Sequence, residues 1–382
     1  MNSASAGPLD ASSRSDCAVR VWETSPGEAA ARTINSKVLR LYGTALRAEI
    51  EASLAALGAS DLSLALDDQG ALPFTLRARI ETAVRRLRPE TRRTIAKVAN
   101  GPNTSSRRRS LRRTRLYLPG NTPKLFINAG LYGADAIILD LEDAVAPAEK
   151  DAARILVGHA LAAVDFGPSE RMVRVNVGAA GLAEIEALAP LGVDVFVLPK
   201  VETPAAVAAA HDAVLRAGGQ AGLLVTLESA RGVMAAAEIA AAPGVVAMTL
   251  GLEDYTADLG ATRTADGVES AWARGQVLNA ARAAGIQPLG SVYPAIDDDA
   301  GFARWVRRER DLGHEGVACL HPRQVALAHA ALAPGDAEVA AAERVIAAAA
   351  RAAGGVTSVD GRMVDAPVVA RARRVLASKE PG

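Results

Sequence analysis

Short apolar runs alternate with helical segments over the last two thirds of the chain. Eight runs have the length and composition of buried strands, and they begin at Leu116, Ala136, Met172, Val195, Leu223, Val245, Pro288 and Gly316. Amphipathic stretches such as 205–218 and 268–285 lie between them and end at glycine, as helices commonly do. This alternation predicts an α/β fold, a TIM-type (β/α)8 barrel. A doubly wound open sheet is the alternative, but no Gly-rich nucleotide-binding motif follows the first strand.

The N-terminal part of the chain has a different pattern. Residues 41–58 and 75–87 have helical periodicity, and residues 62–74 are typical of a β-hairpin around Asp67. These elements predict a small α+β module. The full division that we expect is a module over 1–90, a basic flexible linker over 91–112, the barrel over 113–335 and a C-terminal helical extension over 336–382.

The amino-acid composition indicates which class of ligand the protein binds and in which cellular compartment it is expected. Lysine and arginine (43 residues) balance aspartate and glutamate (43), and aromatic residues make up only 3% of the chain, which argues against a nucleic-acid surface. The N-terminus lacks the apolar segment of a signal peptide, and no apolar run is long enough for a membrane span. Cys17 and Cys319 form no disulfide or zinc pattern. We therefore expect a cytoplasmic protein that binds neither membrane nor nucleic acid and acts on small acids or acyl groups.

Polar residues collect where the predicted strands end. Because the C-terminal ends of parallel barrel strands meet at one mouth, these side chains should lie close together. Five of the eight strands end in this way, with Asp140, Glu142, Asp143, Arg174, Asn176, Lys200, Glu202, Glu228, Glu253 and Asp254.

Crowded carboxylates repel one another and take up protons unless a cation joins them. Glu228 and Asp254 follow adjacent strands, and their carboxylates suit Mg²⁺, which prefers oxygen ligands. Zinc is disfavoured because the five histidines show no paired spacing. His321, at the end of the eighth strand, is interpreted as a structural or supporting group.

Two basic residues suggest the substrate and a competing mechanism. The guanidinium of Arg174 suits a carboxylate, so an acid whose other oxygens chelate the metal, such as a 2-hydroxy or 2-oxo acid, fits the site. Lys200 could instead form a Schiff base with a carbonyl substrate. Its carboxylate neighbours favour an ion-paired lysine.

At these residues the chain resembles the citrate lyase β-subunit (citryl lyase) group of the HpcH/HpaI aldolase/citrate lyase family. The matching stretches include "LRRTRLYLPGN", "DAIILDLEDAVAPAEKDAAR", "RVN", "LPKVET", "LESARGV", "LGLEDYTADLG" and "GRMVDAPVVARARRVL", and the match extends over about residues 110–377. The resemblance implies a Mg²⁺-dependent lyase that acts on acyl thioesters and oxo acids.

The resemblance also assigns roles to single residues. It implies that Glu228 and Asp254 hold the metal, that Arg174 grips a substrate carboxylate, and that Glu142 and Asp143 organise the metal's waters and the substrate. Lys200 and Arg113 are further implied substrate-binding residues. Asp365 matches the family's late acid/base carboxylate, which in related lyases completes the site of a neighbouring subunit, so a homo-oligomer, a trimer or hexamer, is expected.

Residues 6–90 resemble a second family, the citrate lyase γ-subunit, an acyl carrier protein. The stretch "LDDQGALPFTLRARIETAVRR" carries most of this resemblance. In that family a serine before the first strand bears a phosphoribosyl-dephospho-coenzyme A arm. Here an Arg stands where that serine would align, within Ser12-Ser13-Arg14-Ser15-Asp16. Ser15 is the first candidate for attachment and Ser13 the second, and an unmodified leader is the alternative.

Together these features predict cleavage of a citryl thioester to oxaloacetate and an acetyl thioester, with the carrier fused to the lyase and a transferase (α) subunit as a partner. One alternative keeps the enzyme but changes the substrate, to a malyl- or citramalyl-type coenzyme A thioester that is cleaved or hydrolysed, with a vestigial carrier. Another is a non-enzymatic carrier or assembly subunit with the barrel as scaffold.

Overall fold

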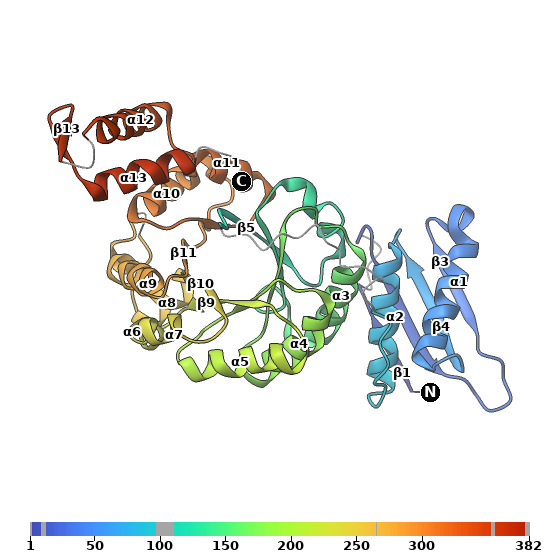
Figure 1. Ribbon diagram of the computed structural model, residues 1–382. Helices are drawn as coiled ribbons and strands as arrows, with labels where there is room; N and C mark the ends of the chain where they lie inside the picture. The colour runs from blue at the N-terminus through green and yellow to red at the C-terminus, as the bar shows by residue number, and fades with distance from the viewer. Residues whose placement is uncertain (1, 9–12, 97–110, 265, 353–355, 379–382) are drawn as a thin grey trace.

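The computed structural model describes residues 2–8, 13–96, 111–264, 266–352 and 356–378 (Figure 1). Most of the predicted linker, residues 97–110, lies outside this range, and so does Ser12. In the part of the chain that the structure describes, no helix is long and apolar enough to cross a membrane.

Eight parallel strands form the barrel that the alternating pattern predicts. They are β5 (Thr114–Pro119), β6 (Ala136–Asp140), β7 (Glu170–Arg174), β8 (Val195–Leu198), β9 (Gly222–Leu227), β10 (Val245–Leu250), β11 (Gln287–Leu289) and β12 (Val317–Cys319). From β5 to β11 each strand pairs with the next in the chain, and β12 pairs with β5. Two backbone hydrogen bonds, from Gly290 to Gly316 at 2.7 Å and from Glu315 to Pro288 at 3.0 Å, link β11 to the β12 segment. The barrel prediction is confirmed, and the open sheet is wrong.

Helices surround the strands as an outer ring (Figure 1). They are α3 (Lys150–Ala163), α4 (Gly178–Leu188), α5 (Pro204–Arg216), α6 (Ala230–Met234), α7 (Ala236–Ala240), α8 (Leu252–Leu259), α9 (Ala271–Ala283), α10 (Asp299–Leu312) and α11 (Pro322–Leu332). Strand side chains alternate between two cores. Ile138, Val197 and Leu224 fill the barrel interior, whereas Leu139, Phe196 and others pack outward against the helices. This double burial explains the continuous apolar runs in the sequence.

The N-terminal module is a four-stranded sheet with two helices. Its elements are β1 (Ser3–Ala6), β2 (Cys17–Glu23), β3 (Arg32–Ser36), α1 (Leu39–Leu57), β4 (Leu62–Asp68) and α2 (Pro73–Leu87), and the strand order is β1-β2-β4-β3. The hairpin prediction over 62–74 is wrong, because β4 leads directly into α2. The Asp68 carboxylate accepts hydrogen bonds from the backbone N–H groups of Gly70 and Ala71, which turns the chain, and Pro73 starts the helix.

Helix α2 fixes the module to the barrel. One face of α2, with Leu76 and Ile80, packs on the module's own sheet, while Phe74 and Ala78 belong to the core of the barrel. Figure 1 shows α2 beside α3, between the barrel and the sheet. The contact includes polar groups as well, because the buried Glu81 carboxylate lies 3.0 Å from Nε2 of His159 in α3. The two parts are therefore docked and not only joined by the chain.

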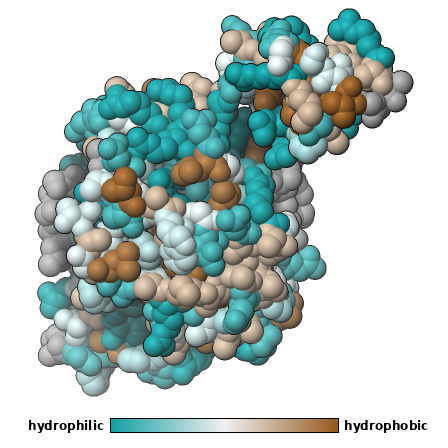
Figure 2. All heavy atoms as spheres, turned by 90° about the vertical axis from the view of Figure 1, so that its left-hand side faces the viewer, coloured by the Kyte–Doolittle hydropathy of each residue, from teal (hydrophilic) through white to brown (hydrophobic). Residues whose placement is uncertain are grey.

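Beyond the barrel, the C-terminal residues form a separate lobe. Helix α12 (Asp336–Arg351) packs on α13 (Ala366–Ala377), with the hairpin β13 (Thr357–Val359) and β14 (Arg362–Val364) between them in the chain. The lobe projects from the top of the molecule (Figures 1 and 2).

Arg86 of α2 is expected to hold the docked state, because its guanidinium donates to both oxygens of Asp151 in α3, at 2.7 and 2.8 Å. We expect Arg86→Ala to raise amide hydrogen exchange about fivefold in both α2 and α3, which corresponds to the ~1 kcal/mol of a partly exposed bidentate pair. Arg88→Ala is the matched control, since Arg88 pairs with Glu23 and Asp61 inside the module. An unchanged α3 in the Arg86 variant would contradict the docking role.

Candidate active site

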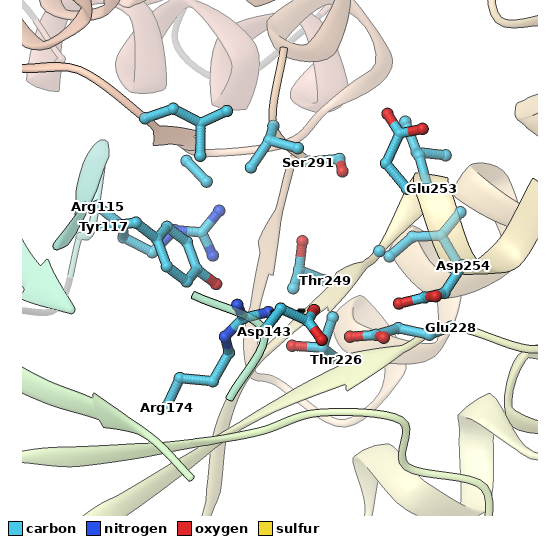
Figure 3. Close-up of a pocket in the computed structure, with 16 residues that line it drawn as sticks. Arg115, Tyr117, Asp143, Arg174, Thr226, Glu228, Thr249, Glu253, Asp254 and Ser291 are labelled. Carbon is cyan, nitrogen blue, oxygen red and sulfur yellow. Dashed lines mark hydrogen bonds and ion pairs between the residues drawn. The ribbon is translucent and has the colours of Figure 1, made fainter. Parts of the chain in front are cut away.

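A pocket of about 220 Å³ opens at the C-terminal ends of the barrel strands (Figure 3). We call this region the mouth. Every barrel strand except β8 is represented in the pocket wall by its own residues or by those that follow it. The lining comprises Arg115, Tyr117, Asp143, Arg174, Thr226, Glu228, Thr249, Leu250, Gly251, Leu252, Glu253, Asp254, Ser291, Val292, Ala318 and Leu320.

Asp140 ends β6 and holds the guanidinium of Arg174, which ends β7. Nε and Nη2 of Arg174 donate to the two Asp140 oxygens at 2.6 and 2.7 Å, and the Asp140 side chain also accepts from the Glu142 backbone N–H at 3.0 Å. Gly120 is needed beside this turn, because a Cβ there would lie 2.5 Å from the Asp140 carbonyl oxygen. The ion pair therefore orients both strand ends.

The remaining Nη1 of Arg174 faces two further carboxylates. It lies 3.0 Å from Oε2 of the buried Glu142 and 3.5 Å from Oδ2 of the exposed Asp143. Burial lowers the pKa of Arg174, but the hydrogen bond to Asp140 and the charges of Asp140 and Glu142 outweigh burial and leave this pKa above its usual value. Arg174 is therefore a fixed cation at the mouth.

Glu228 and Asp254 face each other from neighbouring elements. Glu228 follows β9 and is buried, while Asp254 lies in the first turn of α8 and is half exposed. Burial, hydrogen bonding with Asp254 and the charges of Glu142 and Asp254 raise the pKa of Glu228 to about 8. Gly251 allows this packing, because an added Cβ would lie 2.7 Å from Cγ of Glu228. The structure thus brings the two predicted metal ligands together.

This donor set fits a hard divalent cation. The carboxylate repulsion that raises the pKa of Glu228 would be relieved by a positive charge between Glu228 and Asp254. Among the described residues no group of three or more His, Cys, Asp or Glu side chains could hold a metal ion. Two carboxylates, with the remaining positions open to water and ligand oxygens, are the arrangement that Mg²⁺ commonly takes in proteins.

Lys200 is held as an ion-paired lysine. Its Nζ lies 3.0 Å from Glu142, 3.7 Å from Asp143 and 3.6 Å from Asp254. The hydrogen bond to Glu142 raises the pKa of Lys200 well above its usual value, so the unprotonated amine that a Schiff base requires is disfavoured. Its left-handed backbone, with φ at 52°, is rare for a residue with a side chain.

Two predicted residues lie away from this pocket. Arg113 precedes β5 at the opposite end of the barrel, where its Nε lies 3.1 Å from Oδ2 of Asp135, and it does not line the mouth of its own chain. Asp365 is at the start of α13 in the C-terminal lobe, where Oδ1 accepts from the Val368 backbone N–H at 3.2 Å. It does not line the pocket of its own chain.

Two further positions lie outside the mouth. Ser13 lines a second cavity, of about 360 Å³, formed between the N-terminal module and the loop that follows β5. Ser15 lies in a turn with φ at 61°, and its backbone N–H donates to the Gln69 carbonyl at 3.3 Å. His321 caps α11, since its Nδ1 accepts from the Arg323 backbone N–H at 3.1 Å, so it has the predicted structural role.

Sequence reasoning missed Arg115 and Tyr117, which line the pocket from β5. Both side chains point into the barrel, because they alternate with Leu116 and Leu118 of the outer core. The guanidinium carbon of Arg174 lies 5.2 Å from the centroid of the Tyr117 ring, a cation–π contact. The predicted strand begins at Leu116, one residue after Arg115, so the sequence does not place this arginine inside the barrel.

Comparisons with known proteins agree with this geometry. The family model described as HpcH/HpaI aldolase/citrate lyase matches residues 113–322, and the acyl carrier protein model described as malonate decarboxylase delta subunit (MdcD) matches residues 2–87. Citrate lyase subunit beta of Leuconostoc mesenteroides subsp. cremoris is 42% identical over 283 residues, which cover 70% of this chain and 92% of the relative.

Two other proteins extend the comparison. A (3S)-malyl-CoA thioesterase of Cereibacter sphaeroides is 38% identical over 273 residues, which cover 70% of this chain and 94% of the relative. The crystal structure of protein CitE from Mycobacterium tuberculosis, in complex with magnesium, acetoacetate and coenzyme A, matches with a TM-score of 0.63 and 34% identity. That match covers 70% of this chain and 98% of CitE.

Gly251→Ala should damage the metal site without removing a ligand. The added methyl group would displace Glu228, so we expect Mg²⁺ affinity, measured by isothermal titration calorimetry, to fall at least about tenfold. Gly275→Ala, in α9, is the control, because an added Cβ there meets nothing within 4 Å. Equal Mg²⁺ affinity in the two variants would contradict the assignment of Glu228 as a ligand.

Proposed function

The chain belongs to the HpcH/HpaI aldolase/citrate lyase family, and from this premise we propose that it is a Mg²⁺-dependent lyase that cleaves a citryl thioester to oxaloacetate and an acetyl thioester. In this proposal the acyl group is carried by the N-terminal module of the same chain. The observation that supports it most directly is the Glu228–Asp254 pair at one side of a pocket that also presents arginine side chains (Figure 3). That combination suits an acid whose oxygens chelate a cation.

Each residue has a distinct part in the proposed site. Glu228 and Asp254 would hold Mg²⁺, which, when bound, would supply the positive charge that makes a substrate hydroxyl easier to deprotonate. Arg174 would bind a substrate carboxylate through Nη1, while Asp140 keeps the guanidinium in place. Glu142, paired with Lys200 and Arg174, would position the substrate.

The proposed reaction is a reverse Claisen cleavage. The citryl hydroxyl gives its proton to a base, and the bond between the carbinol carbon and the methylene carbon beside the thioester breaks. Its electron pair forms the enolate of an acetyl thioester, and the carbinol carbon becomes the keto carbon of oxaloacetate. A proton transferred to the methylene carbon then completes the acetyl thioester. In the direction of synthesis the same steps run in reverse.

Asp365 is the proposed donor of that last proton, acting in the pocket of a neighbouring copy. Its place on a lobe that projects from the barrel (Figure 2) supports action in another chain, because it is absent from the lining of its own pocket. Val356 and Met363 on this lobe are 72% and 65% exposed, and they offer apolar surface for contact with another copy. The proposal therefore includes a homo-oligomer, which the resemblance suggests is a trimer or hexamer.

The N-terminal module is the proposed carrier. Its match to an acyl carrier protein family supports this role, and the candidates for attachment of a phosphoribosyl-dephospho-coenzyme A arm remain Ser15 and Ser13. Ser13 borders a cavity beside the loop that follows β5, and the position of this loop at the C-terminal end of the strand supports an attachment site on the mouth side of the barrel. A transferase (α) subunit would exchange the acyl group on this arm.

A second candidate function has support of its own. The 38% identity to a (3S)-malyl-CoA thioesterase favours a malyl- or citramalyl-type lyase or thioesterase that acts on free coenzyme A thioesters. In that case the same metal site would serve, and the module would carry no arm. The scaffold alternative has no such support, because the relatives are enzymes.

Removal of the metal or of its ligands should abolish turnover. We expect EDTA to stop cleavage of the citryl thioester and Mg²⁺ to restore it, and Glu228→Gln and Asp254→Asn to lower kcat by at least about a thousandfold. Glu238→Gln, at an exposed position of α7, should retain full activity. Full activity in EDTA would contradict the metal-dependent mechanism.

The mass of the intact chain from its native host separates the two functions. A covalent arm that maps to Ser15 or Ser13 and is lost in the corresponding Ser→Ala variant is the expected result for carrier-bound citryl chemistry. An unmodified chain that cleaves or hydrolyses free malyl-coenzyme A would instead establish the second function.

A further inference from the structure

Arg115 is a fully buried cation at the floor of the mouth. Its side chain is 2% exposed, and Nη2 donates to the Gly290 carbonyl oxygen at 2.7 Å. Its Nε has no hydrogen-bond partner. Arg115 forms no ion pair with any residue in the described part of the chain, and it lines the pocket opposite Glu228 and Asp254 (Figure 3). The guanidinium is therefore buried without a counter-charge.

Other buried arginines of this protein are compensated. The buried pairs are Arg79–Asp16 at 2.8 Å, Arg112–Glu170 at 2.6 Å and Arg274–Glu309 at 2.5 Å. The two basic residues that share the mouth with Arg115 also have counter-charges within the chain, since Arg174 pairs with Asp140 and Glu142, and Lys200 pairs with Glu142. Arg115 differs from all of them, which indicates that its counter-charge comes from outside the chain.

The charge of the buried Arg115 guanidinium supports this interpretation. Burial lowers its pKa to about 10, so the guanidinium stays protonated at neutral pH. A buried charge without a partner costs folding free energy, and proteins commonly retain such a cost at a functional site. The guanidinium of Arg115 lines the pocket and has an unpaired Nε, so it is suited to bind an oxyanion.

We propose that Arg115 binds a second carboxylate of the ligand, separate from the acid group held at the Glu228–Asp254 metal site, and so selects dicarboxylic 2-oxo acids over monocarboxylic ones. This inference rests on the proposed function for the chemical class of the ligand. Cleavage of a citryl thioester releases a 2-oxo acid with two carboxylates, whereas a malyl thioester carries a single free carboxylate. Arg115 is thus the residue that distinguishes the two candidate substrates.

Calorimetric titration of the full chain with oxaloacetate and with 2-oxobutyrate, in excess Mg²⁺, tests the inference. The two acids share the 2-oxo carboxylate, and oxaloacetate has a carboxylate where 2-oxobutyrate has a methyl group. The wild type should bind oxaloacetate at least about tenfold more tightly. Arg115→Met should weaken oxaloacetate binding by about 10- to 100-fold and leave 2-oxobutyrate within about threefold, because one charge-assisted contact is lost. Arg115→Lys should keep part of the preference.

Two controls make the result decisive. Arg113→Met removes an arginine that pairs with Asp135 away from the mouth, and it should leave the ratio of the two affinities unchanged. Arg115→Met should keep or raise the melting temperature, because it replaces an unpaired buried charge by an apolar side chain of similar length. Equal losses for both acids, or no loss for oxaloacetate, would overturn the inference. Since binding is measured without turnover, failure of the proposed lyase reaction would leave this result intact and separately visible.

Discussion

The ion pair between Asp140 and Arg174 is the contact on which the rest of the mouth depends. It joins the ends of β6 and β7 and leaves one guanidinium nitrogen facing Glu142 and Asp143. Lys200 then meets Glu142 from the end of β8. Acidic and basic side chains therefore alternate along this network. Each charge has a partner of opposite sign, so side chains from three strands stay ordered where like charges would otherwise repel one another.

Much of this arrangement could be predicted from the sequence. Strands buried on both faces read as continuous apolar runs, and a parallel barrel must gather their polar ends, so Glu228, Asp254 and Arg174 could be found without a structure. The positions of two arginines, one residue apart, could not be distinguished in this way. Arg113 and Arg115 occur in the same motif, but one precedes the strand and the other lies inside the barrel, and only the register decides this. The hairpin prediction was wrong for a local reason. The Asp68 side chain forms hydrogen bonds with the turn after β4, and this turn leads into a helix instead of a second strand.

How the N-terminal module sits on the barrel was also beyond sequence reasoning. The linker can be recognised from its composition, but the interface between the module and the barrel depends on which face of α2 contacts α3. In α2 every residue from Phe74 to Val84 except Arg77 is buried, because one face packs on the sheet and another packs on the barrel. A helix with two apolar faces reads in the sequence like any core helix. The contact between Glu81 and His159 inside this interface corresponds to no recognisable sequence motif.

The double burial of α2 has a consequence for how such a fusion can evolve. Because the helix and not the connecting chain sets the position of the module, insertions and deletions in the connection need only preserve its span. Substitutions in α2 and α3, in contrast, are tied to one another and to both cores. Among proteins with this architecture, we therefore expect the connection to vary in length and sequence, and the contacting residues of α2 and α3 to change together.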